Sequence, residues 1–440
     1  MNPKTLMLFA PSAYPLGGVA TWADYLLPGL RSIGWNPTLA LTQGRYHDPA
    51  AYLRIHPFTP VVTIDCGAGA QASRVRNAAA AIAKARPDIV AAVNLPDVAL
   101  AVRRLRGLGA FAGRLAMVEH GINRETLLDM RKLSSVVDAF VGANRLTCAL
   151  ARRFAGLDPS RVFYAPCGVG SSRSPERPQT EHSSKLNLLY AGRLERDQKR
   201  IHELPVLADE LRRLGVAFRL EIAGGGPEEA GLRRRFADSG HEVTFLGVVA
   251  QRELCERVLS QADALLILSA WETGPLVAYE AMAAGVPVVS SRFVGSGLEG
   301  ALIEGDTCLM FPVGDMRAAA AAVARLCDPA LGRRLSEAAL ALVSARYGLE
   351  SSVSRCDVVF RQILDLPKLP PTHSSESLRP SGRLDHWIGP EAGDLVRGAF
   401  GRAYRHGEPG GEWPHLLTRS DAETEAFHAL LGACETGASP

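Results

Sequence analysis

The sequence predicts an α/β protein made of two doubly wound, Rossmann-like domains. Its 440 residues are too many for one ordinary domain, and short apolar runs alternate along the chain with helical patterns. A polar stretch rich in Ser and Pro separates two such series of runs. This alternation is typical of parallel sheets covered by helices on both faces.

The first series predicts an N-terminal domain over residues 1–172. Each apolar run has the length of a buried parallel strand, and helical stretches such as 18–34 and 74–87 lie between them. The predicted strands are 5–11, 37–42, 61–66, 88–94, 114–120 and 139–144. The run at the N-terminus is expected to be a buried strand, because it is short and poorly flanked for a signal peptide.

The second series predicts another domain over residues 186–345, after a linker at 173–185. Its predicted strands are 186–192, 218–224, 242–247, 264–269 and 286–291. Residues 346–365 are expected to form a crossover helix that returns to the first domain. The pattern then breaks at a Pro/Ser-rich stretch, so 366–440 is expected to be an accessory tail, an oligomer contact or a lid.

Composition predicts a soluble, cytoplasmic protein. Hydrophobic residues make up 47% of the chain and charged residues 22%, and no apolar run reaches the roughly 18 residues of a membrane span. The eight cysteines are scattered, without a CxxC pair or a Cys/His cluster, so neither zinc nor a disulfide framework is expected. Abundant Ala and Arg suggest a GC-rich bacterial genome.

Charge is distributed unevenly along the chain. Residues 1–172 hold 19 Lys and Arg against 10 Asp and Glu, whereas the remainder holds 30 against 36. One interpretation is a drift in the composition of a solvated surface. The other is that the basic first domain docks on an anionic membrane or a phosphorylated acceptor, with Arg103, Arg104 and Arg106 as contacts. That contact would be peripheral, on the inner face of the membrane.

Two strand-to-helix turns carry residues suited to phosphate. Gly17 and Gly18 follow the first predicted strand and precede a helix, where backbone N–H groups can approach a phosphate. In the second domain, Arg193 and Lys199 follow the strand that ends at Gly192, and Arg200 is a rival to Lys199. A guanidinium and an ammonium at a strand end suit a diphosphate. Each feature alone also fits an ordinary loop or a solvated surface.

A third turn places one carboxylate before a helix and another inside it. Glu272 lies in the turn "WETGP", and Glu280 lies about one turn into the helix that ends before Gly285 and Pro287. The backbone N–H groups of Gly274, Leu276 and Val277 are expected to be free at the helix start and to favour an anion. Trp271 is expected to pack locally.

The segment from Glu272 to Glu280 resembles the E-x7-E signature of retaining glycosyltransferases of family 4, which have the GT-B fold. The stretches "PLGGVATW", "FYAPCGVG", "YAGRLERDQKRI", "IAGGGPEEAGLR", "VTFLGVVAQREL" and "EAMAAGVPVV" resemble other blocks of that family, in the family's order, between residues 11 and 291. The resemblance implies two Rossmann-like domains facing a central cleft. The first would bind the acceptor and the second a nucleotide-sugar donor.

The resemblance also implies roles for individual residues. Glu272 would contact hydroxyls of the donor sugar, and Glu280 would hold the nucleotide ribose. Arg193 and Lys199 would neutralise the leaving diphosphate, and His120 matches the family's histidine near the donor sugar. Val248 would lie near the base. Further donor contacts would come from Gly17, Gly18, Thr273, Gly274, Pro275, Leu276 and Val277.

The sequence departs from the family pattern at two places. Thr273, Gly274 and Pro275 stand where the family often has Gly-Phe-Gly, and Pro275 has no backbone N–H to offer a ligand. Cys167 and Gly168 stand where an Asn-Gly pair is frequent. Neither change removes a charged group, so we expect them to affect sugar specificity rather than activity.

The predicted function is metal-independent transfer of a sugar, with retention, from a nucleotide-sugar donor to a sugar, lipid-linked or small-molecule acceptor. No cofactor or nucleic-acid partner is expected. No metal ion is expected either, because Asp-x-Asp is absent and cations together with a helix N-terminus can stabilise the leaving group. The alternatives are a sugar phosphorylase, a nucleotide-sugar epimerase and a catalytically silent glycan- or nucleotide-binding subunit. The sequence leaves open the nucleobase, the sugar, the acceptor and the oligomeric state.

Overall fold

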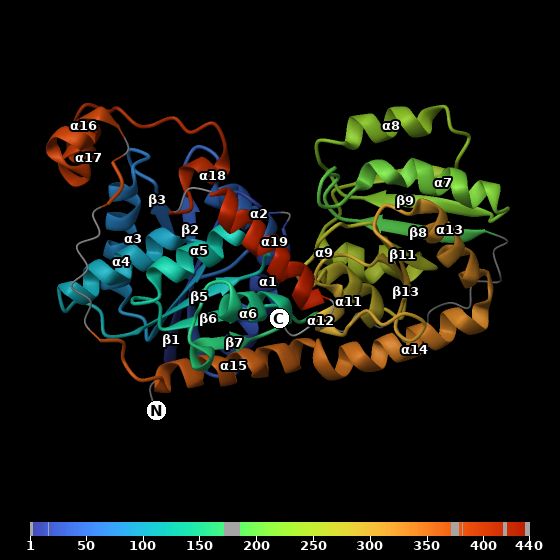
Figure 1. The fold of residues 1–440 in the computed structure, drawn as a ribbon, viewed down its shortest axis with the longest axis horizontal. Helices are drawn as coiled ribbons and strands as arrows, with labels where there is room; N and C mark the ends of the chain where they lie inside the picture. The colour runs from blue at the N-terminus through green and yellow to red at the C-terminus, as the bar shows by residue number, and fades with distance from the viewer. Residues whose placement is uncertain are drawn as a thin grey trace. The chain divides into compact units, whose positions relative to one another are not determined.

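The computed structural model describes residues 3–15, 17–170, 185–370, 378–380, 382–416 and 420–435. Its residues divide into two compact units. Unit 1 combines Met1–Ala165 with Val353–Ala433, and unit 2 is formed by Pro166–Ser352. The sheet and helices of each unit are shown in Figure 1. Most of the predicted linker, 173–185, lies outside the described residues.

Unit 1 contains a seven-stranded parallel sheet in the order β3-β2-β1-β4-β5-β6-β7. Its central strands are buried along their whole length, as expected of a sheet that helices cover on both faces. The strands are β1 (Lys4–Ala10), β2 (Trp35–Gln43), β3 (Val61–Asp65), β4 (Ile89–Val93), β5 (Arg114–Glu119), β6 (Ala139–Gly142) and β7 (Val162–Tyr164). The connecting helices are α1 (Gly18–Ser32), α2 (Pro49–Ile55), α3 (Gln71–Ala85), α4 (Pro96–Gly107), α5 (Arg124–Leu133), α6 (Arg145–Arg153) and the short 3-10 helix η1 (Pro159–Arg161).

Unit 2 contains a six-stranded parallel sheet in the order β10-β9-β8-β11-β12-β13. Its strands are β8 (Leu186–Ala191), β9 (Phe218–Ala223), β10 (Val243–Gly247), β11 (Ala264–Ile267), β12 (Val288–Ser291) and β13 (Leu309–Phe311). Its helices are η2 (Ile201–Glu203), α7 (Leu204–Arg213), α8 (Glu229–Ala237), α9 (Gln251–Glu253), η3 (Leu254–Val258), α10 (Leu259–Gln261), α11 (Leu276–Ala283), α12 (Ser296–Glu299), α13 (Met316–Ala324), η4 (Arg325–Cys327) and α14 (Pro329–Arg346). Leu188, Ile222 and Leu266 of the sheet pack in one core with side chains of α7 and α13.

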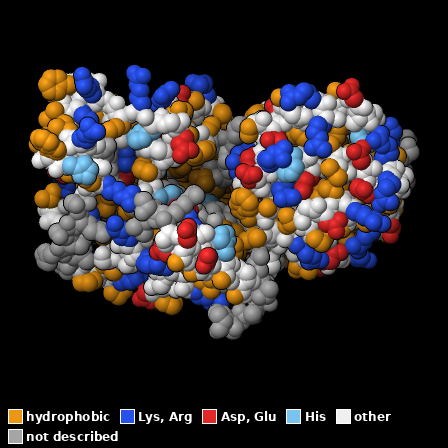
Figure 2. Space-filling view, turned by 45° about the horizontal axis from the view of Figure 1, so that its top comes forward, with side chains coloured by type: hydrophobic (Ala, Val, Ile, Leu, Met, Phe, Trp, Pro, Cys, Tyr) orange, Lys and Arg blue, Asp and Glu red, His pale blue; other side chains and the backbone are white. Residues whose placement is uncertain are grey.

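The predicted α/β class with two doubly wound sheets is confirmed. The eleven predicted strands are all present, and each sheet has one further strand of three residues at its edge, β7 and β13. On the face of unit 2 drawn in Figure 2, Lys and Arg side chains alternate with Asp and Glu side chains. Several charged side chains of unit 2 pair within one helix turn, as Arg233 does with Glu229 and Arg257 with Glu253.

The chain enters unit 1 again through α15 (Leu349–Asp365). This helix packs closely on α1, because Gly29 leaves room for Val353: a Cβ at Gly29 would lie 2.3 Å from Val353 Cγ2. Farther along, Trp35 Nε1 donates to Asp357 Oδ1 at 2.7 Å, and the Arg114 guanidinium donates to the carbonyl oxygen of Leu364. α15 is therefore built into unit 1.

The C-terminal segment after 378 also packs on unit 1. Its helices are α16 (Arg383–Ile388), α17 (Pro390–Ala399), α18 (Pro409–Glu412) and α19 (Asp421–Glu435). The Glu412 carboxylate accepts hydrogen bonds from the backbone N–H groups of Arg45 (2.5 Å) and Tyr46 (2.9 Å), just after β2. The imidazole of His415 contacts the carboxylate of Asp129 at 2.8 Å. These contacts make the segment part of the first unit rather than a loose appendage.

Candidate functional site

The site in unit 2 is built from the loops that follow β8, β9, β10 and β11. In an open parallel sheet, the carboxyl ends of the strands are where ligands bind. The loops approach each other so closely that one position requires glycine. Gly224, after β9, has φ +138°, and a Cβ there would lie 1.9 Å from the carbonyl oxygen of Gly192, after β8. The "IAGGGP" stretch thus packs directly against the loop after β8, which was predicted to bind a diphosphate.

The structure brings Lys199 and Glu272 together. The ammonium of Lys199 forms an ion pair with Oε1 of Glu272, although the two residues lie on different loops. The same Oε1 accepts a hydrogen bond from the Ser269 hydroxyl at 2.6 Å. Glu272 is buried and Lys199 largely so. The pair holds one cation and one carboxylate in fixed positions at the strand ends.

Gln198 connects the second predicted cation to the same pair. Its Oε1 accepts from Arg193 Nη2 at 2.7 Å, and its Nε2 donates to the Trp271 carbonyl oxygen at 3.2 Å and approaches Glu272 Oε2 at 3.5 Å. The loop itself is closed by Glu195, whose carboxylate accepts from the backbone N–H groups of residues 197–199. Burial raises the pKa of Glu195, but these hydrogen bonds outweigh it and lower the pKa below its usual value.

Arg200, the rival to Lys199, faces elsewhere. Its backbone has φ +50°, a left-handed conformation that turns the chain into η2. Its guanidinium pairs with the carboxylate of Glu203, with Nε 3.0 Å from Oε2, and contributes nothing to the Lys199–Glu272 pair. The structure therefore distinguishes two adjacent cations that the sequence could not.

The N-terminus of α11 offers backbone donors beside this pair. Gly274 has φ +118°, and Pro275 is the N-cap residue, with no side chain that caps the helix. The backbone N–H groups of Gly274, Leu276 and Val277 donate no hydrogen bond within the described part of the chain. Because the first N–H groups of a helix carry partial positive charge, this turn suits an anion. Thr273 precedes these residues in the same loop.

Glu280 lies inside α11 and is almost fully buried. Burial raises its pKa to about 7, and a hydrogen bond from the Gln251 amide opposes that rise. Val248 lies three residues before Gln251, has 56% of its surface exposed, and lies near Gly225 at the end of β9. Trp271 is 40% exposed and forms an isolated β-bridge with Val294, so its expected role in local packing stays a prediction.

Gly17, Gly18 and His120 belong to unit 1. Gly17 is the N-cap residue of α1, and its N–H donates to the Tyr14 carbonyl oxygen at 3.1 Å; Gly18 begins the helix. His120 follows β5, and its ring contacts Trp22 edge-on, with ring centroids 4.3 Å apart. Burial lowers the pKa of His120 to about 4, so the imidazole is neutral near pH 7. A neutral imidazole can exchange hydrogen bonds with a hydroxyl without bringing a charge.

These groups can bind an anion without a metal ion. Lys199, Arg193 and the α11 N-terminus supply positive charge, whereas Glu272 and Glu280 supply acceptors for hydroxyl groups. Within the residues that the structure describes, no three His, Cys, Asp or Glu side chains gather in a way that would hold a metal ion. The arrangement is therefore suited to a phosphorylated, hydroxyl-rich ligand.

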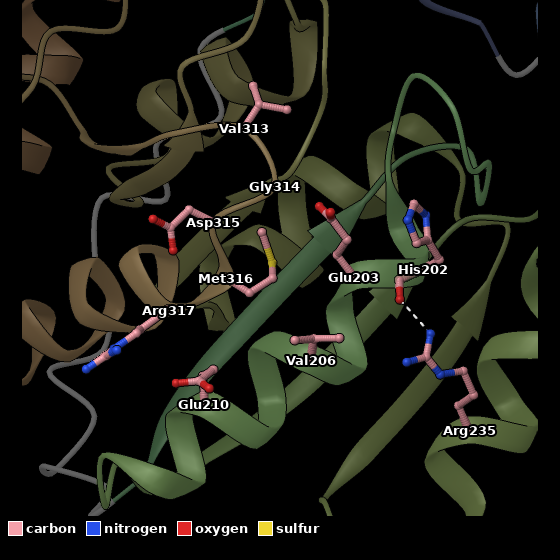
Figure 3. Close-up of a pocket in the computed structure, with 10 residues that line it drawn as sticks. All are labelled: His202, Glu203, Val206, Glu210, Arg235, Val313, Gly314, Asp315, Met316 and Arg317. Atoms are coloured by element: carbon pink, nitrogen blue, oxygen red, sulfur yellow. Dashed lines mark hydrogen bonds between the residues drawn. The ribbon is translucent and has the colours of Figure 1, made fainter.

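A separate depression of about 730 Å³ lies on unit 2 (Figure 3). It is lined by side chains from η2, α7, α8 and the start of α13, among them Glu203, Arg235 and Met316. Figure 3 shows Arg235 donating to the His202 carbonyl oxygen, at 2.7 Å. None of the residues predicted to bind the nucleotide-sugar lines this depression, so it is separate from the candidate site.

Three residues of the site were missed by the sequence analysis. Gln198 lies inside the "RLERDQKRI" stretch but carries no charge, and Ser269 was treated only as the end of a strand. Gln251 lies 29 residues from Glu280 along the chain, and no spacing rule connects the two. An amide beside two cations in one loop is the signal that could have identified Gln198.

The arginines proposed as membrane contacts have partners in unit 1. Arg104 pairs with Glu391 of α17 at 2.6 Å. Arg106 pairs with Asp138 and donates to the carbonyl oxygen of Val136 at 2.7 Å. Arg106 is therefore engaged in the fold, because this bonding ties α4 to the segment that precedes β6. Among the helices of the described residues, none is both long and apolar enough to cross a membrane.

Comparison with known proteins finds relatives of one family. Residues 185–328 match the family described as glycosyl transferases group 1. A glycogen synthase of Mycobacterium tuberculosis is 35% identical over 175 residues, 39% of this chain and 41% of that protein. The N-acetyl-alpha-D-glucosaminyl L-malate synthase of Bacillus anthracis is 32% identical over 152 residues, which cover 34% of this chain and 39% of that protein. The amylovoran biosynthesis glycosyltransferase AmsK of Erwinia amylovora is 25% identical over 317 residues, which cover 68% of this chain and 75% of that protein. The chain thus spans about two fifths of the length of the first two.

Solved structures share the fold over most of the chain. A sucrose-phosphate synthase from Thermosynechococcus elongatus superposes with a TM-score of 0.68 at 21% identity, covering 82% of this chain and 99% of that one. Anabaena HepE in complex with UDP and glucose superposes with a TM-score of 0.65 at 17% identity, covering 81% and 99%. This likeness is one of fold, and it confirms the GT-B architecture that the resemblance implied.

Proposed function

The chain belongs to the group 1 glycosyltransferases, and from that premise we propose that it is a retaining enzyme that transfers a sugar from a nucleotide-sugar donor to an acceptor. The donor would bind unit 2 and the acceptor unit 1. The observation that carries the proposal is the contact between Lys199 and Glu272. It joins a diphosphate-binding cation to a sugar-binding carboxylate in one rigid group.

Each donor moiety has suitable partners in unit 2. Lys199, Arg193 and the N–H groups of Gly274, Leu276 and Val277 would face the diphosphate. Oε1 of Glu272 is occupied by Lys199 and Ser269. Among the described residues, Oε2 has only the long contact from Gln198, and it would accept from sugar hydroxyls. Glu280, one turn into α11, would accept from the ribose hydroxyls.

The rate enhancement would come mainly from charge stabilisation. As the bond between the sugar and the diphosphate breaks, negative charge grows on the leaving group. Cations and hydrogen-bonding N–H groups that are already fixed in place stabilise that charge without reorganising. Gln198 and Ser269 fix Arg193 and Glu272 before any ligand arrives. The role of His120 near the donor sugar stays a prediction, and its imidazole is neutral near pH 7.

A donor panel without acceptor tests the proposal. UDP-glucose is the first donor to use, because UDP-glucose is bound in a solved HepE structure with the same fold. Slow hydrolysis that releases UDP, followed by mass spectrometry, would support transferase chemistry, and EDTA is expected to leave the rate unchanged. Conversion to an isomeric UDP-sugar would indicate an epimerase, and a sugar phosphate formed only with inorganic phosphate a phosphorylase. Binding without turnover of any donor would indicate a silent subunit.

A further inference from the structure

The helical pair α16–α17 of unit 1 exposes an unusual number of large apolar side chains. Trp387 is 89% exposed, Phe400 77% and Leu395 61%. The other exposed apolar side chains of the pair are Leu384, Ile388 and Val396. A contiguous exposed apolar surface on a protein usually marks a place of interaction. We call these six residues the apolar face of the α16–α17 pair.

The pattern is the reverse of an ordinary surface helix, which hides apolar residues and exposes charges. Leu384, Trp387 and Ile388 are spaced three and four apart, so they share one side of α16. Two acidic residues of the pair, Asp385 and Asp394, are buried instead. Asp385 is buried and pairs with Arg397 of α17 at 2.5 Å, and a Cβ at Gly393 would lie 2.1 Å from the Asp385 carboxylate.

The pair is fixed to the sheet domain through its polar side. Asp394 is buried and accepts from Arg76 at 2.7 Å and from the hydroxyl of Ser73, both on α3. Glu391 pairs with Arg104 of α4 at 2.6 Å. Because these anchors use the charged residues, the orientation that leaves Trp387 and Phe400 in water is built into unit 1 and does not result from fraying.

Three arginines lie next to the pair along the chain, one at the start of α16 and two after α17. Arg383, Arg402 and Arg405 are exposed, and none forms an ion pair within the described residues. The acidic side chains of the pair are each occupied: Asp385 by Arg397, Asp394 by Arg76 and Glu391 by Arg104. Figure 2 shows hydrophobic side chains interspersed with Lys and Arg side chains at the end of unit 1 where the two helices lie.

We propose that the α16–α17 pair is a membrane-docking element that lays its apolar face into the interface of an anionic bilayer. Trp and Phe suit the boundary between headgroups and acyl chains, and aliphatic side chains add buried area below it. Arginines beside such a face attract anionic headgroups, and their aliphatic stems can lie along the bilayer surface while the guanidinium stays hydrated.

Vesicle flotation with the full chain tests this proposal and needs no enzymatic activity. Vesicles of phosphatidylcholine with about a third phosphatidylglycerol are compared with pure phosphatidylcholine, at low and high salt. We expect wild-type protein to float with the anionic vesicles at low salt and to be released as salt rises, because exposed charges are screened. The double variant Trp387→Ser, Phe400→Ser should bind at least tenfold more weakly, because two large apolar side chains no longer enter the bilayer.

Matched variants distinguish the effect of the apolar face from the effect of removing any exposed apolar side chain. Leu108→Ser removes another apolar side chain of unit 1, 71% exposed, that lies outside the pair, and should float as the wild type does. Arg383→Gln, Arg402→Gln, Arg405→Gln should lose the preference for anionic vesicles. Wild-type protein that stays unbound at low salt would overturn the proposal, as would equal flotation of the Trp387, Phe400 variant. Sedimentation that shows a wild-type dimer and a monomeric double variant would instead assign the face to a second copy.

Discussion

The ammonium of Lys199 lies against the carboxylate of Glu272, and Ser269 donates to the same carboxylate oxygen at 2.6 Å. Lys199 comes from the loop after β8 and Glu272 from the loop after β11, which are neighbouring strands in the sheet of unit 2. The pair therefore ties together the loop that would bind the diphosphate and the turn that would bind the sugar. Its structural role can be separated by experiment from the chemical role that we propose for it.

Removing only the cation should destabilise unit 2. Lys199→Met leaves the buried Glu272 carboxylate without its ion-pair partner, which typically costs about 3 kcal/mol or more. In Lys199→Met, Glu272→Gln the uncompensated charge is gone, so most of the stability should return while transfer stays lost. Thermal unfolding with activity assays on the same preparations checks both effects. A double variant that is no more stable than Lys199→Met would contradict this account of the pair.

Gln198 should act on the rate through Arg193. Its amide is the partner that holds the largely exposed guanidinium, so Gln198→Leu is expected to lower kcat about tenfold with little change in unfolding temperature. Arg196→Ala is the matched control, because Arg196 lies in the same loop but pairs with Glu228 at 3.3 Å, away from the site. Steady-state UDP release measures both. Equal kcat values in the two variants would show that Gln198 does not position Arg193.

Donor binding should weaken as the pH falls through 7. Burial raises the pKa of Glu280 to about 7, and in the proposed donor site the ribose hydroxyls would donate to the ionised carboxylate. Below the pKa the carboxyl is protonated, and binding must first remove that proton. Between pH 8 and pH 6 the Kd for UDP-glucose is therefore expected to rise about tenfold. Calorimetric titration across this range measures it. Glu280→Gln should bind more weakly at pH 8 and show no such dependence; a variant as pH-dependent as the wild type would assign the effect to another group.

The C-terminal segment should contribute to the stability of unit 1. Glu412→Ala would leave the backbone N–H groups of Arg45 and Tyr46 without their acceptor, at a cost of about 1–3 kcal/mol. The unfolding temperature should fall by several degrees. Glu408→Ala, four residues earlier and exposed, is the control and should leave it unchanged. Equal unfolding temperatures for Glu412→Ala and the wild type would mean that water replaces the Glu412 carboxylate without loss of stability.

Short apolar runs that alternate with helical patterns made the two sheets predictable, and the ends of these runs identified the loops of the site. The edge strands β7 and β13 escaped because three residues give no periodicity. Lys199 and Arg200 are adjacent cations, and only the left-handed turn at Arg200 decides which of them meets Glu272. The apolar face of α16–α17 could not be recognised either, because the sequence does not show that Asp385 is buried against Arg397, or Asp394 against Arg76 of α3.

The central claim is that Arg193 and Lys199 stabilise the leaving diphosphate. The most direct test is kcat at saturating donor for Arg193→Ala, Lys199→Ala, with folding verified by circular dichroism. Each fixed donor at such a position is typically worth about a hundredfold in rate, so we expect kcat to fall at least about a thousandfold while donor binding weakens far less. A folded double variant with near wild-type kcat would contradict the assignment of this site.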